Sequence, residues 1–146
     1  MIDQTRTINA KTAIAAIAGA GDNTPQVSAI IDRRGFDALT FLISTGVLAD
    51  ADAAFTVLLE HDDVVGFGTA VAVPDEALIS QGSAAPETDA GFTFAADGQV
   101  RKIGYRGTKG FVRMTITPAN NTGAWPIAVL ALLGKPYFSQ PTQGTT

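Results

Sequence analysis

Residues 38–60 read ALTFLISTGVLADADAAFTVLLE, in which two apolar segments flank a more polar stretch. The segments at 38–45 and 55–60 are short and rich in β-branched and bulky apolar residues, and such runs favour strands. Between them, the carboxylates of Asp50 and Asp52 are expected to face water in a loop. This part of the sequence therefore predicts two β-strands with a loop between them.

Similar patterns on both sides of this stretch predict two hairpins. The first has strands at 27–31 and 38–45 around a polar turn at 32–35. The second, which has the clearer pattern, has strands at 99–105 and 110–117. Both predictions place sequence neighbours side by side in one sheet.

Weaker signals predict the remaining elements. We expect strands at 70–73 and 92–94, a turn or short helix at 74–78, a surface loop at 81–89 and a turn at 97–98. The nearly all-apolar run 127–133 predicts a strand buried on both faces. The count is about seven to nine short strands with at most one short helix, so the predicted fold class is all-β. The architecture that follows is a single-domain antiparallel β-sandwich or jelly roll.

The two ends of the chain lack a clear strand pattern. Apolar residues near the N-terminus fit neither the helical nor the strand period, and we expect an extended N-terminal arm over 1–24. A break before Pro25 starts the predicted sandwich domain, which covers 25–138. The polar segment 139–146 is predicted as a C-terminal tail. Such arms can become ordered on docking to a neighbouring subunit.

The composition excludes several classes of function. Charged residues make up 16% of the 146 residues, against a typical share of roughly 25%, so much of the surface is expected to be neutral or covered by partners. The net charge of −4 argues against general nucleic-acid binding, which needs excess Lys and Arg. The absence of cysteine excludes disulfides and thiolate chemistry and fits assembly in the cytosol.

The apolar runs are too short for a membrane helix, which needs roughly 20 residues. The longest run, 124–134, is interrupted by Pro126. The stretch 13–20 is weakly similar to the core of a signal peptide, but Met1 is retained, so cleavage is not expected. We therefore expect no membrane partner and no secretion by that route.

The single histidine is the first place to look for catalysis. His61 lies beside Asp62 and Asp63 after a predicted strand, and a triad would also need an activated nucleophile such as Ser44 or Ser80, which nothing in the pattern marks. Adjacent carboxylates on a strand point to opposite faces, which disfavours a shared metal site. The sequence predicts a solvated strand end, no enzyme, no cofactor and no metal.

Charge placement carries more information than any motif. Five of the ten basic residues lie between positions 101 and 113, and nine of the fourteen acidic residues lie between 50 and 89. This distribution predicts one basic and one acidic face, suited to packing against other proteins, and the alternative is ordinary solvated strand faces. The candidate interface residues are Arg101, Lys102, Arg106, Lys109, Arg113 and Trp125.

The chain also resembles a known group of proteins. The segment 38–60, the segment QVRKIGYRGTKGFVRMTITPANNTG at 99–123 and the segment PIAVLALLGKP at 126–136 are similar to small head structural proteins of tailed bacteriophages. The resemblance implies a virion structural protein, first of all a capsid decoration or cement protein on the outer surface of the major capsid protein shell. It further implies self-association, with a trimer favoured, and a place on the virion surface after assembly in the host cytoplasm. It assigns no catalytic residues.

Two alternatives stay open at the level of sequence. One is a head-tail connector, completion or tail protein, which would be present in far fewer copies than a decoration protein. The other is a carbohydrate-binding sandwich module, which would stack sugars on exposed aromatic side chains. The aromatic candidates for that role are Tyr105, Trp125, Tyr137 and any exposed phenylalanines.

Overall fold

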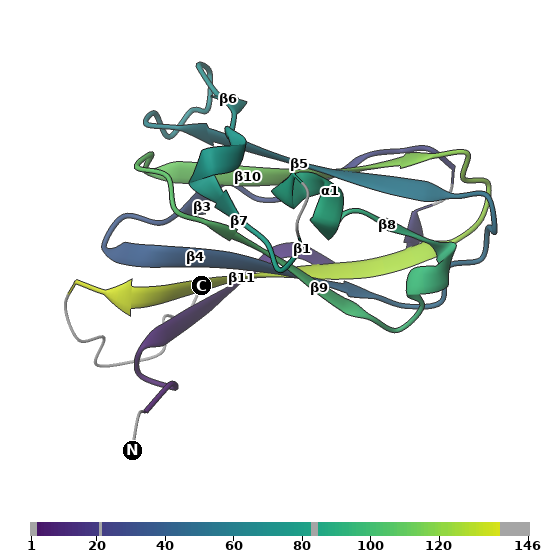
Figure 1. Cartoon of the computed structure of the whole chain (residues 1–146), viewed down its shortest axis with the longest axis horizontal. Helices are drawn as coiled ribbons and strands as arrows, with labels where there is room; N and C mark the ends of the chain where they lie inside the picture. The colour runs from purple at the N-terminus through teal and green to yellow at the C-terminus, as the bar shows by residue number, and fades with distance from the viewer. Residues whose placement is uncertain (1–2, 21, 83–84, 138–146) are drawn as a thin grey trace.

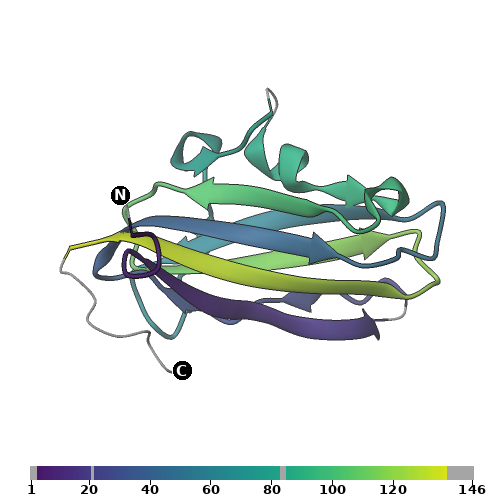
Figure 2. The same cartoon turned by 90° about the horizontal axis from the view of Figure 1, so that it is seen from below.

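The computed structural model describes residues 3–20, 22–82 and 85–137. Two antiparallel sheets pack face to face, as Figure 1 and Figure 2 show from the side and from below. The predicted all-β sandwich is therefore confirmed. The described residues form eleven strands, more than expected. Strands at 8–20 and 78–79 were not predicted as such, and the predicted strand 27–31 is divided into two short ones.

The five-stranded sheet has the order β1-β11-β4-β9-β7. Its strands are β1 (Ile8–Ala20), β11 (Trp125–Pro136), β4 (Phe36–Thr45), β9 (Val100–Tyr105) and β7 (Leu78–Ile79).

The six-stranded sheet has the order β2-β10-β5-β6, with β3 also paired to β10 and β8 to β5. Its strands are β2 (Gln26–Val27), β10 (Phe111–Ala119), β5 (Ala54–Asp62), β6 (Val71–Ala72), β3 (Ile31–Asp32) and β8 (Phe92–Thr93). The short helical segments are η1 (Asp75–Ala77), α1 (Pro86–Ala90) and η2 (Phe94–Ala96).

The core forms where the inward-facing residues of the long strands meet. Leu39, Phe41 and Ile43 alternate along β4 with residues that face outward, and each is at most 1% exposed. The fully buried Trp125 packs on Phe55 with ring centroids 5.1 Å apart. Burying one such side chain stabilises the fold by about 1.5–3 kcal/mol, so this alternation is the main source of the sandwich.

Both predicted hairpins are wrong. β3 pairs with β10, whereas β4 pairs with β11 and β9, so the turn at 32–35 carries the chain from one sheet to the other. β9 and β10 also belong to different sheets. Polar, glycine-containing segments serve equally well as hairpin turns and as corners between packed sheets, so the local sequence does not distinguish the two.

The two corners contact one another. The backbone N–H of Arg33 donates to the carbonyl of Gly110 at 3.0 Å, and its guanidinium Nη1 donates to the carbonyl of Gly107 at 2.6 Å. Arg33 is only 9% exposed. One end of the sandwich is thus closed by a buried arginine that joins both sheet-to-sheet connections.

The predicted N-terminal arm, 1–24, contains a strand of the sandwich. β1 pairs with β11 from Ile8 opposite Gly134 to Ala20 opposite Trp125, and Ala13 and Ile14 lie in the core. The arm is extended as expected, but the sandwich begins at β1 and not at residue 25. Three register shifts interrupt the pairing, and each shift breaks the alternation of apolar and polar positions, which explains why the segment fits no simple period.

Other parts of the prediction need smaller corrections. The surface loop predicted at 81–89 contains most of α1, which starts at Pro86, a residue well suited to a first helical position. The run 127–133 is a strand as predicted, but Leu130 on its outer face is 42% exposed, so only one face is fully buried. The tail predicted at 139–146 lies outside the described residues.

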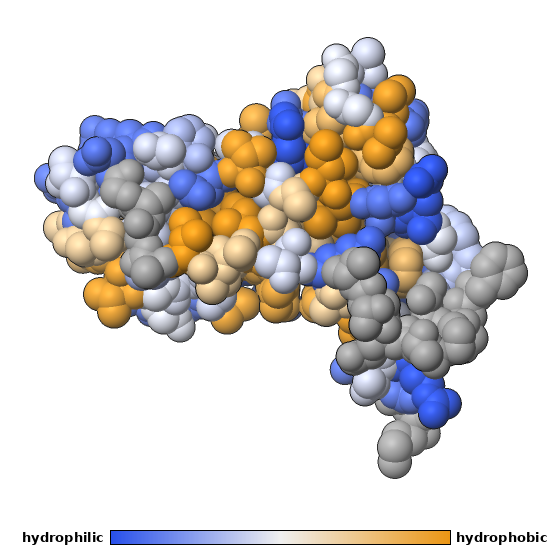
Figure 3. All heavy atoms as spheres, turned by 180° about the vertical axis from the view of Figure 1, so that it is seen from behind, coloured by the Kyte–Doolittle hydropathy of each residue, from blue (hydrophilic) through white to orange (hydrophobic). Residues whose placement is uncertain are grey.

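The edge strand β1 carries one charged side chain, Lys11. On the side of the molecule where β1 lies, seen from behind in Figure 3, hydrophobic residues gather in the middle.

No helix among the described residues is long and apolar enough to cross a membrane.

Candidate functional site

The outward surface of the five-stranded sheet is here called the outer face, and Figure 2 looks onto it. Residues directly opposite each other in an antiparallel sheet point to the same side, so the strand register defines its members. They are Ile8, Ala10, Thr12, Ala38, Thr40, Leu42, Ser44, Ile79, Val100, Lys102, Gly104, Ala128, Leu130, Leu132 and Gly134. Among these described positions, Lys102 carries the only charge.

Several large apolar side chains on the outer face are exposed. Val100 is 65% exposed, Ile79 50% and Leu130 42%. Leu130 lies opposite Leu42 on the neighbouring strand. Single exposed apolar residues are ordinary, whereas several of them on one sheet are typical of a surface that contacts another protein.

The outward surface of the six-stranded sheet is different in character. Thr56 and Thr117 lie opposite one another, and Arg113 lies opposite Glu60. The Arg113 guanidinium donates to Glu60 through Nη2 at 2.6 Å and Nε at 3.2 Å. Arg113 and Glu60 are therefore paired within the chain, while Val27 and Leu58 on the same surface are 53% and 39% exposed.

Two residues of the predicted basic face pair with two residues of the predicted acidic face, because β5 and β10 are paired strands. Their pairing brings Arg113 to Glu60 and, beyond the strand end, Lys109 to Asp63 at 2.6 Å. The Lys109 ammonium, which donates a hydrogen bond to Asp63, lowers the pKa of that carboxyl. The basic and acidic parts of the sequence thus neutralise each other at these two contacts.

The other candidate interface residues lie in three different places. The side chain of Arg101 faces inward from β9, and its Nη1 donates to the carbonyl of Asp89 on α1 at 3.1 Å. Lys102 is exposed on the other side of β9, and Arg106 is exposed directly after the end of that strand. Trp125 is 0% exposed and belongs to the core, so its placement in the candidate interface is wrong.

His61 is not the solvated strand end that the sequence predicts. It is 9% exposed, and its Nδ1 lies 2.8 Å from the Tyr105 hydroxyl. That hydroxyl accepts a hydrogen bond from the backbone N–H of Lys109 at 3.1 Å, which leaves its own hydrogen to be donated to Nδ1. Burial, together with the positive charge of Lys109, lowers the pKa of His61.

The serine and aspartate side chains that could act with His61 in catalysis have other positions or partners. Ser80 donates from Oγ to the carboxylate of Asp89 at 2.6 Å, and Ser44 lies on the outer face. Asp62 accepts hydrogen bonds from the backbone N–H groups of Asp63 and Thr69, at 2.7 and 3.0 Å, and so fixes the loop that follows β5. Within the described residues, no group of three or more acidic or histidine side chains is arranged to hold a metal ion.

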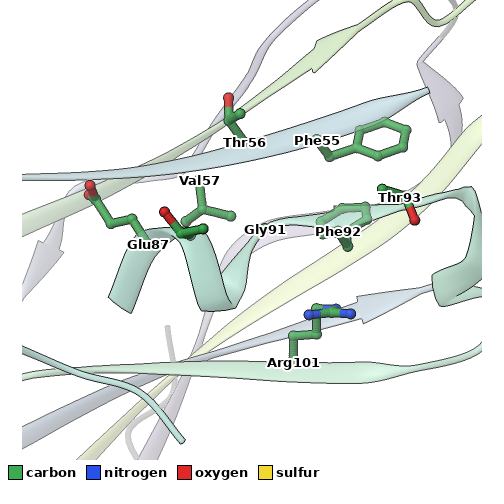
Figure 4. A pocket seen from close by; sticks show the side chains of 9 residues that line it. Phe55, Thr56, Val57, Glu87, Gly91, Phe92, Thr93 and Arg101 are labelled. Atoms are coloured by element: carbon green, nitrogen blue, oxygen red, sulfur yellow. The ribbon is translucent and has the colours of Figure 1, made fainter. Parts of the chain in front are cut away.

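A crevice of about 490 Å³ lies between α1, β5 and β9 (Figure 4). Phe55 and Phe92 stack at 4.7 Å on one side of it, and the carboxyl of Glu87 and the guanidinium of Arg101 lie on others. Burial raises the pKa of Glu87, whose carboxyl accepts the backbone N–H of Leu59. Glu87 and Arg101 connect α1 to the two sheets through these hydrogen bonds. The polar groups of the crevice therefore have a structural role.

Among the described residues, the exposed aromatic candidates for sugar stacking are Tyr137 and Phe94, which lie in separate segments, and Phe94 is 44% exposed. Trp125 and Tyr105 are 0% and 2% exposed, while Tyr137 is 62% exposed but follows the end of β11. Comparison of the sequence with protein-family models and with curated proteins gives no match. The relation to bacteriophage head proteins therefore stays a prediction.

Proposed function

We propose that this chain is a virion structural protein, a capsid decoration or cement protein that binds the outer surface of a major capsid protein shell and stabilises it. The observation that carries the proposal is the outer face, which is formed by the five-stranded sheet and exposes Val100, Ile79 and Leu130. The ion pairs of the six-stranded sheet leave that other surface with its charges already satisfied. The outer face is accordingly the surface assigned to docking.

A repeating shell makes weak docking sufficient. Burial of apolar surface contributes about 25 cal/mol per Å², and part of that gain is lost as the partners give up rotational and side-chain freedom. When several copies are held together, each later contact forms at a high effective concentration. Self-association into a trimer, with the major capsid protein as the common partner, supplies this advantage.

The test is a comparison of particles formed with and without this chain. The virus that encodes the chain is grown with the gene intact and with the gene deleted, and both particles are imaged and heated. We expect on the order of hundreds of copies on the intact shell, in keeping with a closed symmetric lattice, and earlier heat release of DNA from the deleted particle.

Two other outcomes would contradict the proposal. About six or twelve copies at one vertex would indicate a head-tail connector or tail protein, whose rings follow cyclic symmetry. If particles of both genotypes have equal composition and equal heat resistance, the chain is not a component of the virion.

A further inference from the structure

A glycine between two cations creates a hollow in the outer face. Residues 102–106 read KIGYR, and the strand period of two places Lys102, Gly104 and Arg106 on the same side. The pairing of β9 continues to Arg106, whose backbone N–H donates to the carbonyl of Ala77 at 2.9 Å. At about 3.3 Å per residue, the two cationic residues are separated by about 13 Å along the strand, with no side chain between them.

This hollow has a volume of about 550 Å³, and we call it the cationic groove. Thr40 and Gly104 lie beside each other in its lining, and Ile79 of β7 lies next to Gly104. A Cβ atom at Gly104 would meet the Cβ of Ile79 at 3.5 Å. A larger side chain at this position would therefore fill the space.

A third cation enters the groove from the end of β11. Lys135 lines it, and so does one carboxylate, Asp37. The backbone of Lys135 has a φ of +50°, a left-handed conformation that costs free energy for a residue with a side chain. A glycine would adopt this conformation at a lower cost. The surrounding structure therefore maintains the conformation at Lys135.

The three cations of the cationic groove lack carboxylate partners within the described residues. Within the described residues, four of the ten basic residues of the chain form ion pairs, and none of the four lies in the groove: Arg6, Arg34, Lys109 and Arg113. By contrast, the only side-chain hydrogen bond of Arg106 in the described part runs from Nε to the backbone carbonyl of Glu76, at 2.9 Å. That bond orients the guanidinium and leaves its other N–H groups available.

We propose that the cationic groove binds an extended acidic segment of a partner protein, with carboxylates on Lys102 and Arg106. In an extended chain, side chains four residues apart lie on one side and about 13 Å from each other, which matches the spacing of these two cations. A nucleic acid fits less well, because its backbone is bound through many contacts of Lys and Arg with phosphates, whereas the groove offers three cations next to one carboxylate, Asp37. The inference rests on the proposed docking function of the outer face and adds the chemistry of the partner.

The experiment uses the full chain and a fluorescently labelled peptide with two glutamates separated by three threonines. Binding is followed by fluorescence anisotropy at low salt, and the same peptide with two glutamines is the matched probe. We expect the glutamate peptide to bind and the glutamine peptide to bind at least about tenfold more weakly, since two charge-assisted contacts are lost.

Variants then locate the binding site. The double variant Lys102→Gln with Arg106→Gln is expected to weaken binding about tenfold, and Gly104→Val is expected to block it by filling the groove. Lys11→Gln on β1 removes a charge outside the groove and is expected to leave binding unchanged. Circular dichroism of each variant checks that the fold is intact.

Three results would overturn the inference. Equal binding of both peptides would exclude recognition of carboxylates, and equal loss in Lys11→Gln would show a general charge effect. Tighter binding of a six-nucleotide thymidine strand would assign the groove to nucleic acid. Because these measurements use the isolated chain, they fail or succeed independently of the particle imaging that tests the proposed function.

Discussion

At the scale of single residues, the end of the sandwich around Tyr105 is the most constrained part of the molecule. Its hydroxyl contacts His61 and the backbone of Lys109, and the guanidinium of Arg33 lies 5.5 Å from its ring centroid. None of these contacts is visible as a motif, because the partners are far apart in the sequence. They join β5, β9 and both sheet-to-sheet corners at one point.

Protonation of His61 is expected to destabilise this end of the fold. The pKa of His61 is lowered in the folded chain from an unfolded value of about 6.5, so the unfolded state takes up the proton more readily. The stability that neutral His61 provides is present above pH 6.5 and is lost as the pH falls through the lower folded pKa. Protonated Nδ1 can no longer accept the Tyr105 hydroxyl hydrogen.

Urea denaturation at pH 7.5 and pH 5 measures this effect, with His61→Asn as the control. The raised pKa of Glu87 acts in the opposite direction, since its stabilising contribution is lost as the pH rises. Glu87 is common to both proteins, so their difference isolates His61. We expect the free energy of unfolding of the native chain to fall relative to that of His61→Asn at pH 5, and an unchanged difference would refute the assignment.

Gly107 is required by the position of Tyr105. A Cβ atom at Gly107 would overlap the Tyr105 hydroxyl, which His61 and Lys109 hold in place. We therefore expect Gly107→Ala to lower the free energy of unfolding by about 1–3 kcal/mol. At Gly110 the added atom would meet the flexible side chain of Arg34 at 3.3 Å, so Gly110→Ala is the milder control. Equal stability of the two variants in urea would contradict this packing.

At the scale of elements, the positions of the long strands could be predicted from the sequence, but their partners could not. Alternation of apolar residues within β4 and β5 indicates a strand with one buried face. The choice between a hairpin and a corner depends on contacts such as that between Arg33 and Gly107, 74 positions apart. Two-residue strands such as β2 and β3 can be recognised as strands only from their pairing with β10.

The candidate interface was predictable only in part, because it also depends on which strands are paired. Sequence position grouped Arg101 with Lys102, but the strand period points them to opposite sides of β9. Applied to residues 102–106, the period would also have identified the face shared by Lys102, Gly104 and Arg106. The third member of that cluster, Lys135, comes from β11 and requires the sheet order.

The inclusion of β1 in the sandwich gives a direct test at this scale. Ile14 is 6% exposed and Ile8 is 38% exposed, although both belong to β1. We expect Ile14→Ala to lower the free energy of unfolding by about 2–4 kcal/mol, and Ile8→Ala to lower it by about 1 kcal/mol or less. Urea titrations measure both values. Two equally small effects would show that this segment is an arm outside the core.

At the scale of the whole molecule, the asymmetry between the two sheets is the feature that bears on function. The six-stranded sheet pairs Arg113 with Glu60 on its outward surface, while the charges on the outer face are gathered at the cationic groove. A sheet surface that exposes apolar side chains and gathers its charges in one groove is suited to lie flat on a larger protein assembly. The cationic groove adds a polar contact that fixes the orientation of docking.

The most direct test of this account compares two leucines on opposite sides of the sandwich. Leu130 on the outer face is 42% exposed, and Leu58 on the outward surface of the six-stranded sheet is 39% exposed. Shells that lack this chain are mixed with the wild-type chain, with Leu130→Lys or with Leu58→Lys, and the number of bound copies is measured by cryo-electron microscopy. The account predicts that Leu130→Lys abolishes binding while Leu58→Lys binds as the wild type does. Loss of binding with Leu58→Lys and full binding with Leu130→Lys would contradict it.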